Sequence, residues 1–147
     1  MDRAKLKIQL KVDEGIRYRR YLDTVGKWTI GVGHNISDDP HYHFTLADEP
    51  LSDRQVMALL EDDINETERQ LDARLPWWRT LNDARQNVLA NMCFNMGITT
   101  LSTFRNTLRA MKEGRFTDAA HGMEQSKWYT QVGDRAKRLV AIMRAGF

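Results

Sequence analysis

The chain has 147 residues, of which 41% are hydrophobic and 29% are charged, and its 22 basic and 20 acidic side chains give a net charge of +2. This length fits about one domain and is enough for a hydrophobic core, so an intrinsically disordered chain is excluded. The single cysteine, Cys93, excludes a disulfide framework and a multi-cysteine zinc site, and no apolar run is long enough for a membrane span.

The charge is unevenly distributed along the chain. Residues 1–34 carry 8 basic and 4 acidic side chains, residues 35–100 carry 5 and 12, and residues 101–147 carry 9 and 4. The basic ends could meet a polyanion such as a nucleic acid, a phospholipid or an anionic cell-wall polymer, or they could neutralise the acidic middle within the fold. No recognised nucleic-acid-binding signature accompanies them, so nucleic acid is not an expected partner.

The first 20 residues contain too many charges for the apolar segment of a signal peptide. We therefore expect a protein made in the cytoplasm, without export by the standard route and without stable membrane insertion.

Residues 3–14 carry two conflicting patterns. Apolar residues alternate with polar ones between Leu6 and Val12, which is typical of a strand. The same segment is rich in residues that favour a helix, and Gly15 follows as a stop signal. We predict a helix, with Ala4, Ile8 and Val12 on its apolar stripe.

Residues 16–33 predict a β-hairpin. Aromatic and β-branched residues gather at 18–22 and 27–32, and the intervening Asp23-Thr24-Val25-Gly26 has the chemistry of a turn. Residues 35–50 predict a polar loop with room for a short extra strand. His41 and His43 lie there among aspartates, but a polar surface loop explains them better than a metal site does.

Ser52 and Gln55 predict a capping box at the start of a long helix. The expected buried face of this helix has six residues, and Pro76 ends it: Val56, Leu60, Ile64, Thr67, Leu71 and Leu75. Its acidic outer face is expected to be solvated.

The remaining residues predict a bundle of helices. One helix runs from its cap Asn82 to Met96, another begins at Ser102 or Thr103 and ends near Gly114, and a short one begins at Thr117. The last begins at Asp134. Trp77 and Trp78 are expected to pack between the long helix and this bundle, and Trp128 and Tyr129 are expected to anchor the core.

These elements predict an α+β fold: a small N-terminal lobe with an antiparallel β-hairpin sheet, joined by a long helix to a C-terminal helical bundle. We expect a single domain over residues 1–147, with lobes of approximately 13–60 and 1–12 plus 61–147. A cleft between two lobes is a common place for a ligand site.

Two carboxylates in unlike environments suggest acid/base chemistry. Glu14 ends the first helix, where the negative end of the helix dipole disfavours a charged carboxylate, whereas Asp23 lies in a turn. Glycoside hydrolysis needs such a pair, one group to donate a proton and one to stay ionised. The spacing alone is weak support, because a glutamate and an aspartate nine residues apart also occur by chance.

The segment as a whole resembles the catalytic segment of the T-even phage lysozyme family, the phage-type muramidases of glycoside hydrolase family twenty-four. The matching positions are Glu14-Gly15, Arg17, Tyr21, Asp23-Thr24, Gly26, Thr29-Ile30-Gly31 and Gly33-His34. Further blocks follow in the family's order: Asn91-Met92, Phe94 and Met96-Gly97; Phe104, Asn106 and Leu108-Arg109; Ser126, Trp128-Tyr129, Gln131 and Arg135 to Arg138.

This resemblance implies a lysozyme-like fold and the hydrolysis of the β-1,4 bond between N-acetylmuramic acid and N-acetylglucosamine in bacterial peptidoglycan. It assigns Glu14 as the general acid, Asp23 as the second carboxylate, and Thr29 as the residue that helps to hold the attacking water. The implied mechanism inverts the anomeric carbon, which requires carboxyl groups about 6.5–9.5 Å apart.

Other positions carry over from the family as well. His34 is expected to pair with Asp63 on the long helix, and Arg135 is expected to contact Glu14; both are supporting contacts. Three residues are expected to touch the glycan: Asn35, Phe94 and Thr107. The sequence departs from the family at Asn35, where a leucine is usual, and at Gly122, where an asparagine is usual, and the loop after His34 is shorter.

The family implies no metal and no cofactor. It implies an endolysin that acts as a monomer, stays in the host cytoplasm until lysis and needs a holin to reach the periplasm and the cell wall. Two alternatives remain: a lytic transglycosylase that cuts the same bond, and a peptidoglycan-binding protein without catalysis. The transglycosylase is disfavoured by Asp23 and Thr29, because such enzymes typically rely on one glutamate.

Overall fold

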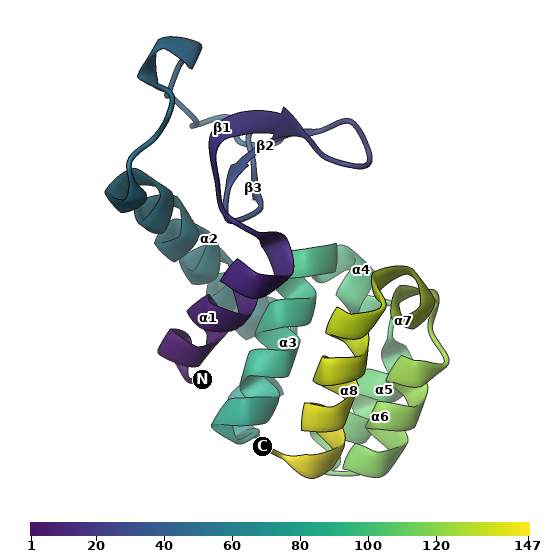
Figure 1. Cartoon of the computed structure of the whole chain (residues 1–147). Coiled ribbons are helices and arrows are strands. Elements are labelled where there is room, and N and C mark those ends of the chain that lie inside the picture. The colour runs from purple at the N-terminus through teal and green to yellow at the C-terminus, as the bar shows by residue number, and fades with distance from the viewer. The chain divides into compact units, whose positions relative to one another are not determined.

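The computed structural model describes residues 1–147, which form eight α-helices and one three-stranded antiparallel sheet (Figure 1). The predicted α+β class is therefore confirmed. The chain divides into two compact units, which we call the sheet unit, Lys7–Glu66, and the helical unit, Met1–Leu6 with Thr67–Phe147. The lobe boundaries expected from the sequence stay a prediction.

Helix α1, Arg3–Glu14, is confirmed, but its predicted apolar stripe is wrong. The side chains of Ile8 and Val12 are 63% and 70% exposed, whereas Leu6 and Leu10 are almost completely buried. Both pairs are spaced by four residues and satisfy the same helical periodicity. Periodicity alone could not choose between the two faces, and tertiary packing selects the leucines.

The sheet has the order β1-β2-β3, with strands Arg17–Leu22, Trp28–Gly31 and His34–Asn35. The predicted hairpin joins β1 to β2. Its turn is closed by hydrogen bonds from the backbone N–H of Asp23 to the Lys27 carbonyl and from the N–H of Gly26 to the Asp23 carbonyl. Gly26 has a φ of 80°, a conformation that favours glycine. The third strand is the short extra strand for which the sequence left room.

The loop after β3 contains a 3₁₀ helix, Leu46–Asp48, and leads into the long helix α2, Asp53–Arg74. The predicted capping box is present: the N–H of Ser52 donates to the Gln55 side chain, and the N–H of Gln55 donates to the Ser52 hydroxyl. All six residues expected on the inner face of this segment are buried: Val56, Leu60, Ile64, Thr67, Leu71 and Leu75. A second 3₁₀ helix, Pro76–Thr80, follows.

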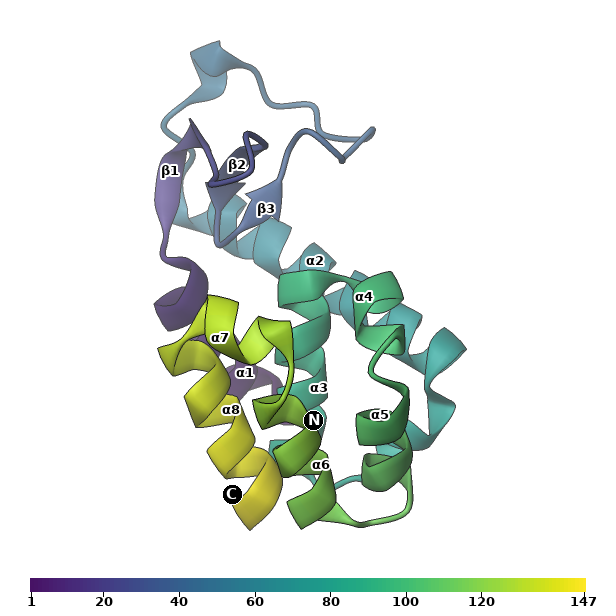
Figure 2. The ribbon, with the colours of Figure 1, turned by 90° about the vertical axis from the view of Figure 1, so that its right-hand side faces the viewer.

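The helical unit contains α3 (Asp83–Met96), α4 (Ile98–Ser102), α5 (Arg105–Lys112), α6 (Phe116–Glu124), α7 (Lys127–Val132) and α8 (Asp134–Ala145). Helix α8 packs against α3 and α6, and α5 lies beside α6 (Figure 2). The side chain of Asn82 caps α3 as predicted, and α8 begins at Asp134 as predicted.

Three details of the helical prediction are wrong. The sequence did not indicate α4 or α7 as separate helices, and α5 begins at Arg105 instead of Ser102 or Thr103. The hydroxyls of Ser102 and Thr103 donate to the carbonyls of Ile98 and Thr100, so neither serves as an N-cap. Helix α6 begins one residue before Thr117.

Two tryptophans anchor the helical unit. Trp78 is fully buried and its indole N–H donates to Asp72 at 2.7 Å, while the indole N–H of Trp128 donates to Asn95 at 2.8 Å. A buried tryptophan needs a partner for this one donor, and both have one. Cys93 is buried in α3, and its thiol donates a hydrogen bond to the side-chain oxygen of Gln70 at 3.8 Å.

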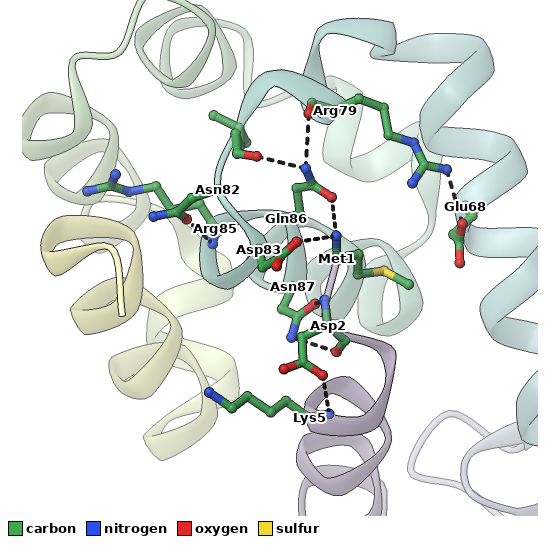
Figure 3. A network of polar contacts seen from close by, with 11 residues as sticks. Met1, Asp2, Lys5, Glu68, Arg79, Asn82, Asp83, Arg85, Gln86 and Asn87 are labelled. Carbon is green, nitrogen blue, oxygen red and sulfur yellow. Dashed lines mark hydrogen bonds and ion pairs between the residues drawn. The ribbon is translucent and has the colours of Figure 1, made fainter.

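A polar network ties the first residues of the chain to α3 within the helical unit (Figure 3). The terminal ammonium of Met1 donates to Asp83 and Gln86, and Asp2 and Asn87 exchange a pair of hydrogen bonds. The amide of Gln86 also donates to two carbonyls, those of Arg79 and Leu81. Gln86 and Asn87 are buried, so these bonds satisfy polar groups that water cannot reach.

None of the helices has the length and apolar composition that would let it cross a membrane.

Candidate active site

Glu14 is the last residue of α1, and its carboxyl group packs against the backbone of Gly33. A Cβ atom at position 33 would lie 3.0 Å from the carboxyl carbon and from Oε1 of Glu14. Gly33 also has a φ of 65°, which strains any other residue. The backbone conformation therefore favours glycine, and a larger residue would also push the Glu14 carboxyl group aside by a few tenths of an ångström.

Asp23 is held in the hairpin turn by the backbone. Its Oδ1 accepts hydrogen bonds from the N–H groups of Val25 and Lys27 at 2.9 and 2.8 Å. One oxygen of the carboxylate is thereby fixed by the turn, which orients the whole group.

Thr29 lies on β2 and its side chain is almost completely buried. Its Oγ1 donates to the carbonyl of Lys27 at 3.1 Å. Directly opposite Thr29 lie Tyr21 on β1 and Asn35 on β3. Residues that are directly opposite in an antiparallel sheet share one face, so Tyr21, Thr29 and Asn35 form a row across the sheet.

Tyr21 lies in this row, although the motif match assigned it no role. The guanidinium of Arg17 lies 4.9 Å from the centre of its ring. Burial raises the pKa of the Tyr21 phenol, the charges of Glu14 and Asp23 raise it as well, and Arg17 opposes them. The two carboxylates therefore act on one phenol. The sequence signal that could have found it is the hairpin register, which pairs Tyr21 with Thr29.

Asn35, expected to touch glycan, is engaged with its own loop. Its amide donates to Asp38 Oδ2 at 2.8 Å, and its side-chain oxygen accepts from the backbone N–H of Asp38. Lys27 pairs with the same carboxylate. These bonds fix the entry to the loop after β3, and the expected contact with glycan stays a prediction.

The expected contact between His34 and Asp63 is present, with Nδ1 and Oδ2 2.8 Å apart. A second carboxylate, Asp39, lies 2.8 Å from the other ring nitrogen, and the sequence did not suggest it. Burial lowers the pKa of His34, but the hydrogen bonds and charges of Asp63 and Asp39 raise it by more. The pKa of His34 therefore lies above its ordinary value. His34 thus connects the loop to α2 through Asp39 and Asp63.

The other predicted residues belong to the helical unit. Phe94 is half-buried on α3, and the buried Arg135 donates from Nε to the side chain of Asn91 at 2.8 Å. Thr107 is buried on α5 and faces Gly122 on α6. Glu14, Asp23 and Thr29 all lie in the sheet unit. The candidate catalytic residues and the three residues Phe94, Thr107 and Arg135 therefore belong to different units.

A groove lies along the neighbouring helices α5 and α6 of the helical unit. One part has a volume of about 490 Å³ and the adjoining part about 320 Å³; Asn106, Thr107 and Gly122 line both. A Cβ atom at position 122 would lie 2.2 Å from Oγ1 of Thr107. The side chain of Thr107 therefore occupies the space left by the missing side chain of Gly122, and a side chain at position 122 would force Thr107 to move.

The histidines of the loop after β3 form no cluster that could bind a metal ion. His41 and His43 are exposed, and the chain brings together no group of three or more His, Cys, Asp or Glu side chains that could hold a metal ion. The nearby aspartates bind elsewhere: Asp39 binds His34, and Asp48 accepts hydrogen bonds from Thr45.

Comparison with known proteins gives consistent matches. The family model described as phage lysozyme matches residues 11–144. The chain is 31% identical over 155 residues to the pre-baseplate central spike protein Gp5 of Enterobacteria phage T4, across 93% of the chain and 27% of that protein. It is 27% identical over 162 residues to probable T4-type lysozyme 1 of Dictyostelium discoideum, across 97% of the chain and 95% of that protein.

A third relative is the endolysin of Acyrthosiphon pisum secondary endosymbiont phage 1, 26% identical over 121 residues, across 82% of the chain and 75% of that protein. With the α+β fold, these matches define a glycoside hydrolase of the lysozyme class. Because the family model covers most of the chain, the protein belongs to the phage lysozyme family. It spans about a quarter of the spike protein, so the same kind of domain also occurs within a longer chain.

Proposed function

We propose that the protein is a muramidase that hydrolyses the β-1,4 bond between N-acetylmuramic acid and N-acetylglucosamine in peptidoglycan, with inversion at the anomeric carbon. The observation that carries the proposal is the set of Glu14, Asp23 and Thr29 in one compact unit of a phage lysozyme chain. The backbone fixes the two carboxylates differently, one against Gly33 and one in a turn.

In the proposed reaction Glu14 donates a proton to the glycosidic oxygen as the bond to the anomeric carbon breaks. A water molecule attacks that carbon from the opposite face and gives its proton to Asp23. Thr29 accepts a hydrogen bond from this water, because its own hydroxyl proton is directed to the Lys27 carbonyl. The carboxylate of Asp23 and the hydroxyl of Thr29 belong to one hairpin, and both can accept a hydrogen bond from the attacking water.

Glycan binding is proposed to involve Asn35, Phe94 and Thr107, with Thr107 lining the groove between α5 and α6. We assign supporting roles to His34 with Asp63, and to Arg135 through a contact with Glu14. As an endolysin, the protein would act as a monomer in host lysis and reach the wall through a holin; the name of one relative supports this role.

The proposal is tested by mass spectrometry of peptidoglycan fragments after digestion with the wild-type protein. Reducing N-acetylmuramic acid ends are expected, because water is the nucleophile. Anhydro-muramic ends would instead identify a lytic transglycosylase and remove the role of Asp23. Intact strands that retain the protein would identify a binding protein without catalysis.

A further inference from the structure

The row of Tyr21, Thr29 and Asn35 crosses the sheet on the face that carries Thr29. The residues next to it along the strands, Ile30 and His34, pair on the opposite face and are buried. Alternation of side chains along a strand keeps the two sets apart. A water molecule that contacts Thr29 is therefore on the same side of the sheet as Tyr21.

The hydrogen bonds of such a water can be counted. Asp23 in its ionised form can only accept a hydrogen bond. The hydroxyl of Thr29 has one proton, and this proton is directed to the Lys27 carbonyl at 3.1 Å, so Thr29 is left as an acceptor. Water that gives one hydrogen to each of these groups has two lone pairs left. One attacks the anomeric carbon, and the other can accept a hydrogen bond.

Tyr21 has the properties of the missing donor. Arg17 lies 4.9 Å from the centre of its ring and holds the ring in place. Burial and the charges of Glu14 and Asp23 raise the pKa of the phenol, so it keeps its proton at neutral pH. Asn35, the other polar member of the row, already donates its amide to Asp38.

We propose that Tyr21 orients the attacking water, its phenol O–H donating to one lone pair so that the other points at the anomeric carbon. This role rests on the proposed hydrolysis. The phenol gives up no proton: the water proton goes to Asp23 and the Glu14 proton goes to the leaving oxygen. Tyr21 therefore contributes to the rate of the chemical step and not to the affinity for glycan.

The test compares Tyr21→Phe with Tyr18→Phe on soluble peptidoglycan fragments of defined length. Tyr21→Phe keeps the ring and its contact with Arg17 but loses the O–H. Tyr18→Phe is the matched control on the same strand, because the Tyr18 hydroxyl donates to Asp53 and not into the row. Loss of one oriented hydrogen bond predicts that kcat of Tyr21→Phe falls about tenfold. KM and the melting temperature should stay at the wild-type values.

Three other outcomes for Tyr21→Phe overturn the inference. A Tyr21→Phe protein with wild-type kcat would show that the hydroxyl is not used. A raised KM at unchanged kcat would assign Tyr21 to glycan binding, and a loss of rate that follows a lower melting temperature would assign it to folding. A wild-type protein that leaves peptidoglycan intact would refute the proposed function instead, and the Tyr21 comparison is interpreted only once wild-type hydrolysis has been measured.

Discussion

The two candidate carboxylates of the sheet unit and the buried side chains of the helical unit are held in different ways. The backbone shapes the surroundings of the carboxylates: N–H groups of the turn bind Asp23, and Gly33 leaves the space for Glu14. In the helical unit buried side chains also hold one another, as in Arg135 with Asn91 and Trp128 with Asn95. Reactive groups that are fixed by turns and strand ends depend on local backbone shape, whereas the helical unit depends on packing between helices.

This comparison predicts that changes at Glu14 and at Gly33 beside it act on rate, whereas changes away from the two carboxylates act on binding or stability. The largest effect is expected for Glu14→Gln, which keeps the shape of the side chain but removes the proposed acid. The hydrolysis rate should fall about 10³-fold, because general acid catalysis is lost. The melting temperature should change little.

The rate is measured by release of reducing ends from purified peptidoglycan. Asp62→Asn is the control, since it removes one exposed carboxylate of the same unit from α2. Wild-type rates in Glu14→Gln would refute the assignment of the acid.

Gly33→Ala separates backbone strain from the collision with Glu14. Its positive φ should cost about 1–2 kcal/mol of folding free energy. The new Cβ should also displace the carboxyl group by a few tenths of an ångström. Because a displacement of about one ångström costs about a hundredfold in rate, we expect a several-fold loss of rate.

Gly114→Ala in the helical unit is the matched control. Gly114 has a φ of 75°, but a Cβ atom there would meet nothing within 4 Å. Urea unfolding should show similar losses of stability for both variants, and only Gly33→Ala should lose activity beyond what unfolding explains. Equal activities in the two variants would contradict the role of the Glu14 contact.

Asp63→Asn tests the connection between the loop and α2. The pKa of His34 lies above its ordinary value of 6.5, so the stabilising contribution is complete below pH 6.5 and is lost as the pH rises through the folded value. Near pH 6 the variant should be less stable by about 2 kcal/mol, the value of a hydrogen bond to a charged group. The difference from wild type should narrow at higher pH.

The pH series is measured by urea unfolding between pH 5 and pH 9. Asp39 adds no trend in this range: burial raises its pKa, but hydrogen bonds from the backbone N–H of His41 and from His34 lower it more, so its contribution is complete above its ordinary value of 3.8 and is lost only at lower pH. Asp62→Asn again serves as the control on α2. If the difference in unfolding free energy between Asp63→Asn and wild type does not change with pH, the charge of His34 is excluded as its cause.

The smallest effect is expected for Gly122→Asn in the groove of the helical unit. The added side chain should push Thr107 aside, since a Cβ atom would lie 2.2 Å from Oγ1. Loss of one glycan hydrogen bond would raise KM about fivefold, while kcat stays constant. Replacing a helical glycine by asparagine also favours the helix by a few tenths of a kcal/mol, which offsets only a small part of the strain.

Two further variants sharpen this result. Thr107→Ser combined with Gly122→Asn should recover part of the affinity, because serine keeps the hydroxyl but rotates more freely than threonine. Thr117→Asn, an exposed change on the same helix, should leave KM unchanged. An unchanged or lower KM in Gly122→Asn would show that moving Thr107 removes no contact with glycan.

Much of the fold was predictable because it is determined by local chemistry. The capping box at Ser52 and Gln55, the inner face of α2 and the hairpin turn at Asp23 each follow from residues a few positions apart. The family resemblance added the candidate residues Glu14, Asp23 and Thr29, which the spacing of two carboxylates could not establish alone.

Other features could not be read from the chain, because they depend on groups that are distant in sequence or on a choice between equivalent patterns. Leu6 and Leu10 face inward in place of Ile8 and Val12, although both pairs have the same spacing. Ser102 and Thr103 have the right chemistry for an N-cap, but their hydroxyls bond backward to carbonyls of the preceding turn.

The sequence by itself determined the α+β class, the main helices and strands, and the family, because periodicity, capping and motif order are properties of neighbouring residues. Only the tertiary structure decided that Asp39 joins Asp63 at His34, that Gly33 makes room for Glu14, and that Tyr21 lies opposite Thr29. These contacts bring together separate elements, and their energies depend on burial and register, which exist only once the chain has folded.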